Sequence, residues 1–115
     1  MANPSSTKAK IKKVTPKLFE LIEATVYGDI WERPELSKRD RSMITIAALV
    51  AMRQTDQLRS HLEKALDNGL SAKEIGEVIT HLAIYSGFPA SLSAALIAGA
   101  LLEDLGLIQE GRVDE

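Results

Sequence analysis

Apolar side chains recur every three or four residues along most of the chain, which is the spacing of one face of an α-helix. A first helix is expected over 16–27, and Pro34 disfavours helix in the connection that follows over 29–36. No stretch alternates β-branched or aromatic residues with polar ones, so no strand is predicted. The sequence therefore predicts an all-α protein of five to six helices in antiparallel helical hairpins.

Polar and small residues mark where the later helices begin and end. Ser37, followed three residues on by an aspartate, favours a helix start. Asp56 is expected to cap the next helix, which Gly69 ends. Ser71 and the glutamate three residues later have the spacing of a capping box. Pro89 suits the first turn of the last helix, because its missing amide proton is not needed there.

Two of the predicted helices are apolar on most of their faces. Nine of the ten residues over 43–52 are apolar, so this helix is expected to be buried nearly all round. The last helix is rich in small residues and has more apolar surface than the core of one small domain covers. We therefore expect a homo-oligomer, with an unusually tight monomer as the alternative. The most apolar stretch, 90–102, is about 13 residues long and too short to cross a bilayer, so no membrane partner is expected.

Length and charge set further bounds. The 115 residues suffice for one domain, assigned to 13–106, between a disordered basic tail over 1–12 and an acidic tail over 107–115. Five lysines and no acid occur over 1–17, but the whole chain has a formal charge of -2. A solvated tail is therefore favoured over a nucleic-acid or lipid contact. No secretory leader opens the chain, and a cytoplasmic protein is expected.

The chain has no cysteine, which excludes thiolate nucleophiles, disulfides and cysteine metal sites. With two histidines and no H-E-x-x-H spacing, no metal site is expected. Glycine-rich phosphate loops and dinucleotide fingerprints are absent from the sequence, so no cofactor is expected. Any chemistry must therefore use histidine, carboxylate, basic, hydroxyl or backbone groups.

A few residues are candidates for such chemistry. His61 falls at the edge of an apolar helical face, where it is either a satisfied core residue or part of a site. His81 shares a helical line with Glu77 and Tyr85, which are possible partners, and a solvated pair is the alternative. Near the start of the second helix, Arg41 suits either a carboxylate ligand or a surface ion pair.

Five short motifs follow one another along the chain. They are WERPEL over 31–36, RDRS over 39–42, LRSH over 58–61, NGLS over 68–71 and HLAIYSGFPA over 81–90. Together they resemble the carboxymuconolactone decarboxylase family over about residues 27–103. The resemblance implies the all-α fold of the alkyl hydroperoxidase D-like superfamily, with copies of the chain assembled in rings as hexamers or trimers.

The superfamily has two chemistries, and the absence of cysteine separates them. In the peroxidase branch two thiols precede the helix-borne histidine, and their positions fall on Gln54 and Gln57 of this sequence. Thiol-based peroxidase activity is therefore excluded. The sequence is more similar to the other branch, cofactor-free decarboxylases of 4-carboxymuconolactone in aromatic compound catabolism.

The resemblance implies how this chain handles such a substrate, a small γ-lactone with carboxylates. The enzyme must hold the carboxylates, stabilise an enolate oxygen and return a proton to carbon. Catalytic roles are expected for His61, as general acid or base, for His81 and for Arg41. The substrate-binding residues implied are Arg33, Tyr85 and Trp31.

Two alternative hypotheses stay open. In the first, the chain is a family member that acts on another small molecule, because one fold supports different pockets. In the second, the chain is a non-catalytic oligomeric binding protein in which His61 and His81 are structural.

Overall fold

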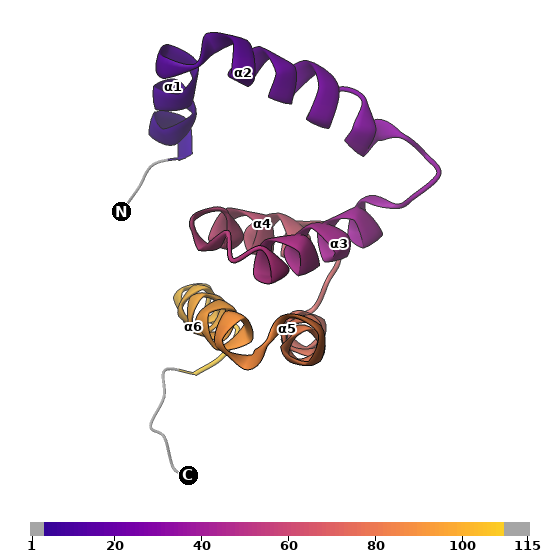
Figure 1. Ribbon diagram of the computed structural model, residues 1–115, viewed down its shortest axis with the longest axis vertical. Helices are drawn as coiled ribbons and strands as arrows, with labels where there is room; N and C mark the ends of the chain where they lie inside the picture. The colour runs from indigo at the N-terminus through magenta and orange to yellow at the C-terminus, as the bar shows by residue number, and fades with distance from the viewer. Residues whose placement is uncertain (1–3, 110–115) are drawn as a thin grey trace. The chain divides into compact units, whose positions relative to one another are not determined.

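A computed structural model describes residues 4–109, and side chains from residue 7 onward; within this range it contains six α-helices and no strand (Figure 1). The prediction of an all-α protein of five to six helices is confirmed. The chain forms two compact units, one ending at Leu36 and one beginning at Ser37. This division falls inside the range 13–106 that the sequence analysis treated as one domain.

The first unit consists of short helical segments. They are α1 (Pro4–Val14), α2 (Pro16–Leu21), the wider π-helical turn η1 (Ile22–Tyr27) and the 3-10 turn η2 (Ile30–Glu32). Helix α1 occupies most of the segment predicted to be a disordered tail. Its alanine and lysines favour helix, which outweighs the absence of an apolar face. Lys12 lies over the ring of Phe19, 5.7 Å from its centroid, and so connects α1 with α2.

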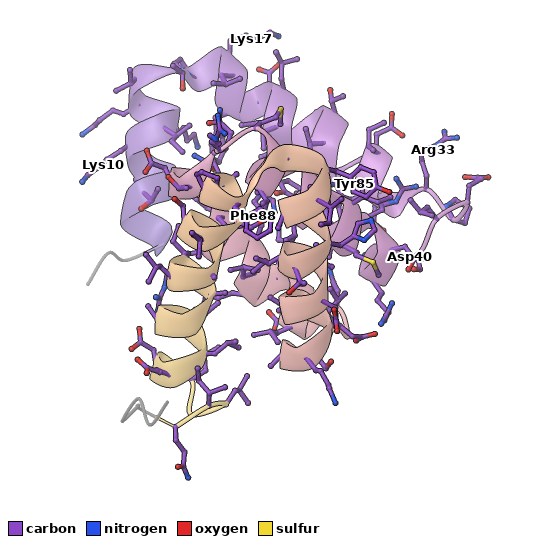
Figure 2. The ribbon with its side chains drawn as sticks, turned by 60° about the horizontal axis from the view of Figure 1, so that its bottom comes forward. Lys10, Lys17, Arg33, Asp40, Tyr85 and Phe88 are labelled. Atoms are coloured by element: carbon purple, nitrogen blue, oxygen red, sulfur yellow. The ribbon has the colours of Figure 1, made fainter. Side chains whose placement is uncertain are left out.

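The second unit consists of four longer helices that pack around one core. They are α3 (Lys38–Ala51), α4 (Thr55–Asp67), α5 (Ala72–Ser86) and α6 (Phe88–Asp104). Helix α3 contacts the other three, α4 also packs on α6, and α5 and α6 lie side by side as a hairpin (Figure 2). The largest fully buried side chains are Ile46, Leu58, Leu62, Ile75, Leu101 and Val50. The predicted helical hairpins are therefore present in this unit.

Most of the predicted helix boundaries are confirmed. The Ser37 hydroxyl accepts a hydrogen bond of 3.0 Å from the amide of Asp40 at the start of α3. At the start of α5, Ser71 and Glu74 form both hydrogen bonds of a capping box, at 3.0 and 2.9 Å. Gly69 follows α4 with a φ of +108°, a left-handed conformation that glycine adopts without steric cost.

The predicted cap of α4 is wrong. The helix begins at Thr55, after Gln54, so Asp56 lies in its first turn instead of preceding it. The cause is the tight reversal after α3, where the amide of Gln54 donates to the carbonyl of Leu49 at 2.9 Å and brings the chain directly into the next helix.

The two apolar helices are not buried all round within one chain. Ile44 of α3 is 57% exposed, contrary to the expectation for 43–52. Helix α6 buries one face against the core, including Ala94, Ala98 and Leu101, and leaves another face in solvent, with Leu92 at 64% and Leu96 at 78%. Among the residues described, no helix is both long and apolar enough to cross a membrane.

Candidate functional site

A small pocket opens between the end of α3, the start of α4 and the first turns of α6. Its volume is about 270 Å³. Its apolar lining comes from Leu49, Val50, Leu58, Pro89, Ala90 and Ala94. The polar side chains in the lining are Arg53, Thr55 and Ser93. All of these residues belong to the second unit, and a mostly apolar hollow with a few polar groups is typical of small-molecule sites.

Arg53 lies in the tight turn between α3 and α4. Its φ of +58° is in the left-handed region, where no other non-glycine residue is found among the residues described. The turn is fixed by backbone hydrogen bonds from the amides of Met52, Arg53 and Gln54 to carbonyls of α3, at 2.9, 3.1 and 2.9 Å. Arg53 cannot be recognised from the sequence, because its position at the pocket depends on how α6 packs against the turn.

His61 lies on α4, three residues after the pocket-lining Leu58 and so on a neighbouring part of the same helical surface. Its ring is partly buried and makes no hydrogen bond to any residue described, which agrees with its predicted place at the edge of an apolar face. Burial lowers the pKa of His61 below its ordinary value, and the positive charge of Lys64 lowers it further. The imidazole is therefore neutral at neutral pH.

His81 and Tyr85 lie one turn apart near the end of α5. Their rings contact each other in a tilted arrangement, with centroids 4.9 Å apart and an interplanar angle of 35°. Both side chains are exposed, and Figure 2 shows Tyr85 at the end of α5 that leads into Phe88. Within the described part of the chain no ion pair joins His81 to Glu77. Of the two partners proposed for His81, Tyr85 is therefore the one in contact with it.

The arginines at the start of α3 have different surroundings. Arg39 donates to Glu74 on α5 and lies 3.6 Å from Asp40, so it takes part in structural ion pairs. Arg41 is partly buried, and its Nε atom is fully shielded from solvent. Its backbone carbonyl accepts a hydrogen bond of 2.7 Å from the hydroxyl of Thr45.

Trp31 and Arg33 belong to the first unit. The ring of Trp31 lies 5.9 Å from that of Tyr27, with an interplanar angle of 34°. Arg33 is exposed and pairs with Glu35 at 3.8 Å. Of the six residues proposed for the site, His81 and Tyr85 have their rings in contact.

None of those six residues lines the pocket; Arg53, Thr55 and Ser93 supply its polar groups instead. One signal in the sequence pointed to this region: the thiol positions of the peroxidase branch fall on Gln54 and Gln57, beside Arg53 and Thr55. Among residues 4–109, no group of three or more histidines and carboxylates is placed to hold a metal ion.

The fold and pocket define an all-helical protein of packed hairpins with a small, mostly apolar cavity. The model of the carboxymuconolactone decarboxylase family matches residues 16–100. The chain is 39% identical over 89 residues to a 4-carboxymuconolactone decarboxylase of Acinetobacter baylyi, which covers 77% of this chain and 66% of that protein. The protein therefore belongs to the carboxymuconolactone decarboxylase family, as its motifs predicted.

A second relative has a different substrate in its name. The chain is 30% identical over 86 residues to a nitrosuccinic acid decarboxylase of Metarhizium robertsii, which covers 75% of this chain and 60% of that protein. The chain thus spans somewhat less than two thirds of the length of both relatives.

Proposed function

We propose that the protein is a carboxy-lyase that converts 4-carboxymuconolactone to 3-oxoadipate enol-lactone without a cofactor, in aromatic compound catabolism. The observation that carries the proposal is the 39% identity to a 4-carboxymuconolactone decarboxylase over 77% of the chain. The pocket between α3, α4 and α6 supports it, because its volume of about 270 Å³ suits a small ligand.

The reaction needs no external electron acceptor. The bond between the ring carbon and its carboxylate breaks, carbon dioxide leaves, and the electron pair is delocalised through the ring double bond into the lactone carbonyl. A proton then adds to carbon and gives the enol-lactone. The protein must hold the carboxylates, stabilise the negative oxygen and supply the proton, and a mostly apolar pocket favours loss of a charged carboxylate.

In this proposal His61 is the general acid. It lies on α4 three residues after the pocket-lining Leu58 and outside the lining itself, so it would act on the substrate from the edge of the pocket. Its lowered pKa makes the protonated ring a stronger proton donor. His81 with Tyr85 would supply further hydrogen-bond donors. Arg41, Arg33 and Trp31 do not line this pocket, so their proposed roles, carboxylate binding for the arginines and a wall for the tryptophan, need contacts with the substrate outside the lining.

The same proposal includes self-association into a ring, as a hexamer or a trimer. One chain leaves a line of large apolar side chains on α6 in solvent, with Phe88 and Leu92 each 64% exposed and Leu96 78% exposed. Residues four apart lie on one helical face, so these three form a continuous stripe that we call the α6 stripe. A second copy of the chain would cover it.

A second candidate function is decarboxylation of another small acid. The 30% identity to a nitrosuccinic acid decarboxylase favours it, because two relatives whose names give different substrates are both similar to this chain in sequence. The two candidates differ in the acid that fills the pocket and agree on loss of carbon dioxide.

The test is to incubate the purified protein with 4-carboxymuconolactone and, separately, with nitrosuccinate, and to measure released carbon dioxide and the ultraviolet absorbance of the lactone. We expect carbon dioxide and a change in absorbance with 4-carboxymuconolactone. Release from nitrosuccinate alone would favour the second candidate. Release from neither acid would contradict both and favour a binding protein without this activity.

A further inference from the structure

We propose that Arg53 anchors the substrate in the pocket between α3, α4 and α6, its guanidinium binding a carboxylate while the apolar lining holds the rest of the acid. This inference deepens the proposed function and rests on it for the identity of the ligand.

The backbone at Arg53 is unusual for an arginine. A side chain with a Cβ is disfavoured at a φ of +58°, and glycine adopts this conformation most easily. Three backbone hydrogen bonds to α3 hold the turn in place, so the left-handed conformation is fixed by the fold. As a result the first atoms of the Arg53 side chain start from a rigid turn at the rim of the pocket that they line.

The charge of Arg53 is not used elsewhere in the described part of the chain. Arg33, Arg39 and Arg59 each lie within ion-pair distance of a carboxylate, whereas none of the ion pairs among residues 7–109 involves Arg53. It is also the one charged residue in the lining of the pocket. A guanidinium binds carboxylates through two parallel hydrogen bonds, and an apolar surrounding strengthens the attraction.

Two helix ends add to the preference for an anion. Thr55 begins α4, and Pro89 and Ala90 lie in the first turn of α6. Neither helix has a side-chain hydrogen bond from its N-cap, Gln54 for α4 and Gly87 for α6. Both helix starts thus contribute residues to the lining of the pocket, and the partial positive charge at a helix start favours an anion nearby.

The test measures binding of succinate, a small dicarboxylate, to the full chain by isothermal titration calorimetry, with the neutral succinamide as the matched probe. We expect the wild type to bind succinate at least tenfold more tightly than succinamide. Arg53→Gln and Arg53→Gly should each weaken succinate binding about tenfold or more, and Arg53→Lys should retain part of it. Arg59→Gln removes a half-exposed arginine of α4 that lies outside the pocket lining and pairs with Asp104 of α6. This variant should bind succinate as the wild type does.

Arg53→Gly separates binding from folding. Glycine relieves the strain of the left-handed conformation, so this variant should melt at or above the wild-type temperature while its succinate binding is weakened.

Three results would each overturn the proposal: wild-type affinity for succinate in Arg53→Gln, equal binding of succinate and succinamide, or no binding of succinate by the wild type. If the Arg53 variants lose succinate binding and the wild type decarboxylates neither acid, Arg53 is an anion anchor and the proposed function is rejected. If Arg53→Gln decarboxylates its substrate with an unchanged KM, the proposed function is retained and the role of Arg53 in substrate binding is rejected.

Discussion

His61 lies at the boundary between the core of the second unit and solvent, and its protonation affects the stability of the fold. Its ordinary pKa is 6.5, and burial lowers this value in the folded protein. Between the two pKa values the unfolded chain binds more protons than the folded one, so the free energy of unfolding rises with pH in that interval. Above the ordinary pKa the stabilisation from the neutral ring is fully present, and it is lost as the pH falls below it.

We therefore predict that the melting temperature falls as the pH is lowered from 7 to below 6, and that His61→Gln reduces this dependence. The measurement is thermal unfolding across that pH range for both proteins. Parallel curves for the wild type and the variant would show that His61 does not titrate with a lowered pKa.

The same residue sets a prediction for catalysis. If the protonated imidazole returns the proton to carbon, kcat/KM should fall about tenfold per pH unit above the lowered pKa, because only the protonated fraction of the free enzyme is active. His61→Ala should lower kcat by at least about a hundredfold with the fold retained by circular dichroism. Unchanged turnover in a folded His61→Ala would remove the residue from the mechanism.

The position and contacts of some residues can be predicted from the sequence, and those of others cannot. The edge position of His61 follows from helical spacing, which is a local property. The ring contact between His81 and Tyr85 also lies within one helix and was accessible from the sequence. Arg53 was not, because its role depends on α6 packing against the turn after α3, a contact between segments far apart in the chain.

Helix α5 shows how a local signal fixes an element and then connects it with another. Ser71 and Glu74 cap its first turn, and Glu74 also accepts from Arg39 of α3. Hydrogen bonding to the amide of Ser71 lowers the pKa of Glu74, and the Arg39 guanidinium lowers it further. The stabilisation from this carboxylate is present above its ordinary pKa of 4.5 and is lost as the pH falls through its lowered value in the folded protein.

We predict that Ser71→Ala lowers the free energy of unfolding by about 1 kcal/mol, because an amide of the first turn loses its acceptor. The measurement is urea unfolding at neutral pH. Ser60→Ala is a suitable control, since Ser60 is an exposed residue in the interior of α4. A change within the experimental error for Ser71→Ala would contradict the role of the capping box.

The helix boundaries that a side-chain cap determines were predicted correctly. The boundary that packing and the chain reversal determine was not. The starts of α3 and α5 follow from serine caps. The start of α4 does not, because the chain reversal through Gln54 places the helix start ahead of the expected Asp56 cap. Helix α1 was missed because its polar composition resembles a tail, although lysine and alanine favour helix.

On the scale of the whole molecule, the main unexplained feature of a single chain is the α6 stripe of Phe88, Leu92 and Leu96. The core buries the face of α6 that carries Ala94 and Ala98 and leaves this stripe in solvent. The sequence predicted surplus apolar surface on this helix but not which face would remain uncovered, because that depends on where α4 and α5 pack.

If copies of the chain associate through the α6 stripe, a charge placed on it should separate them. We predict that Leu92→Glu with Leu96→Glu shifts the protein to a monomer in size-exclusion chromatography with light scattering. Ser60→Glu adds a charge on α4 and should leave the assembly unchanged. A wild type that is already monomeric, or a double variant of unaltered mass, would contradict the association.

We propose that this chain removes a carboxylate from a small lactone and returns a proton to carbon. The most direct measurement is the reaction of the wild-type protein with 4-carboxymuconolactone in D2O, followed by proton and carbon NMR. We predict release of carbon dioxide and an enol-lactone that contains deuterium at the carbon next to the lactone carbonyl. An unchanged lactone, or a ring opened by hydrolysis with its carboxylate retained, would contradict the account.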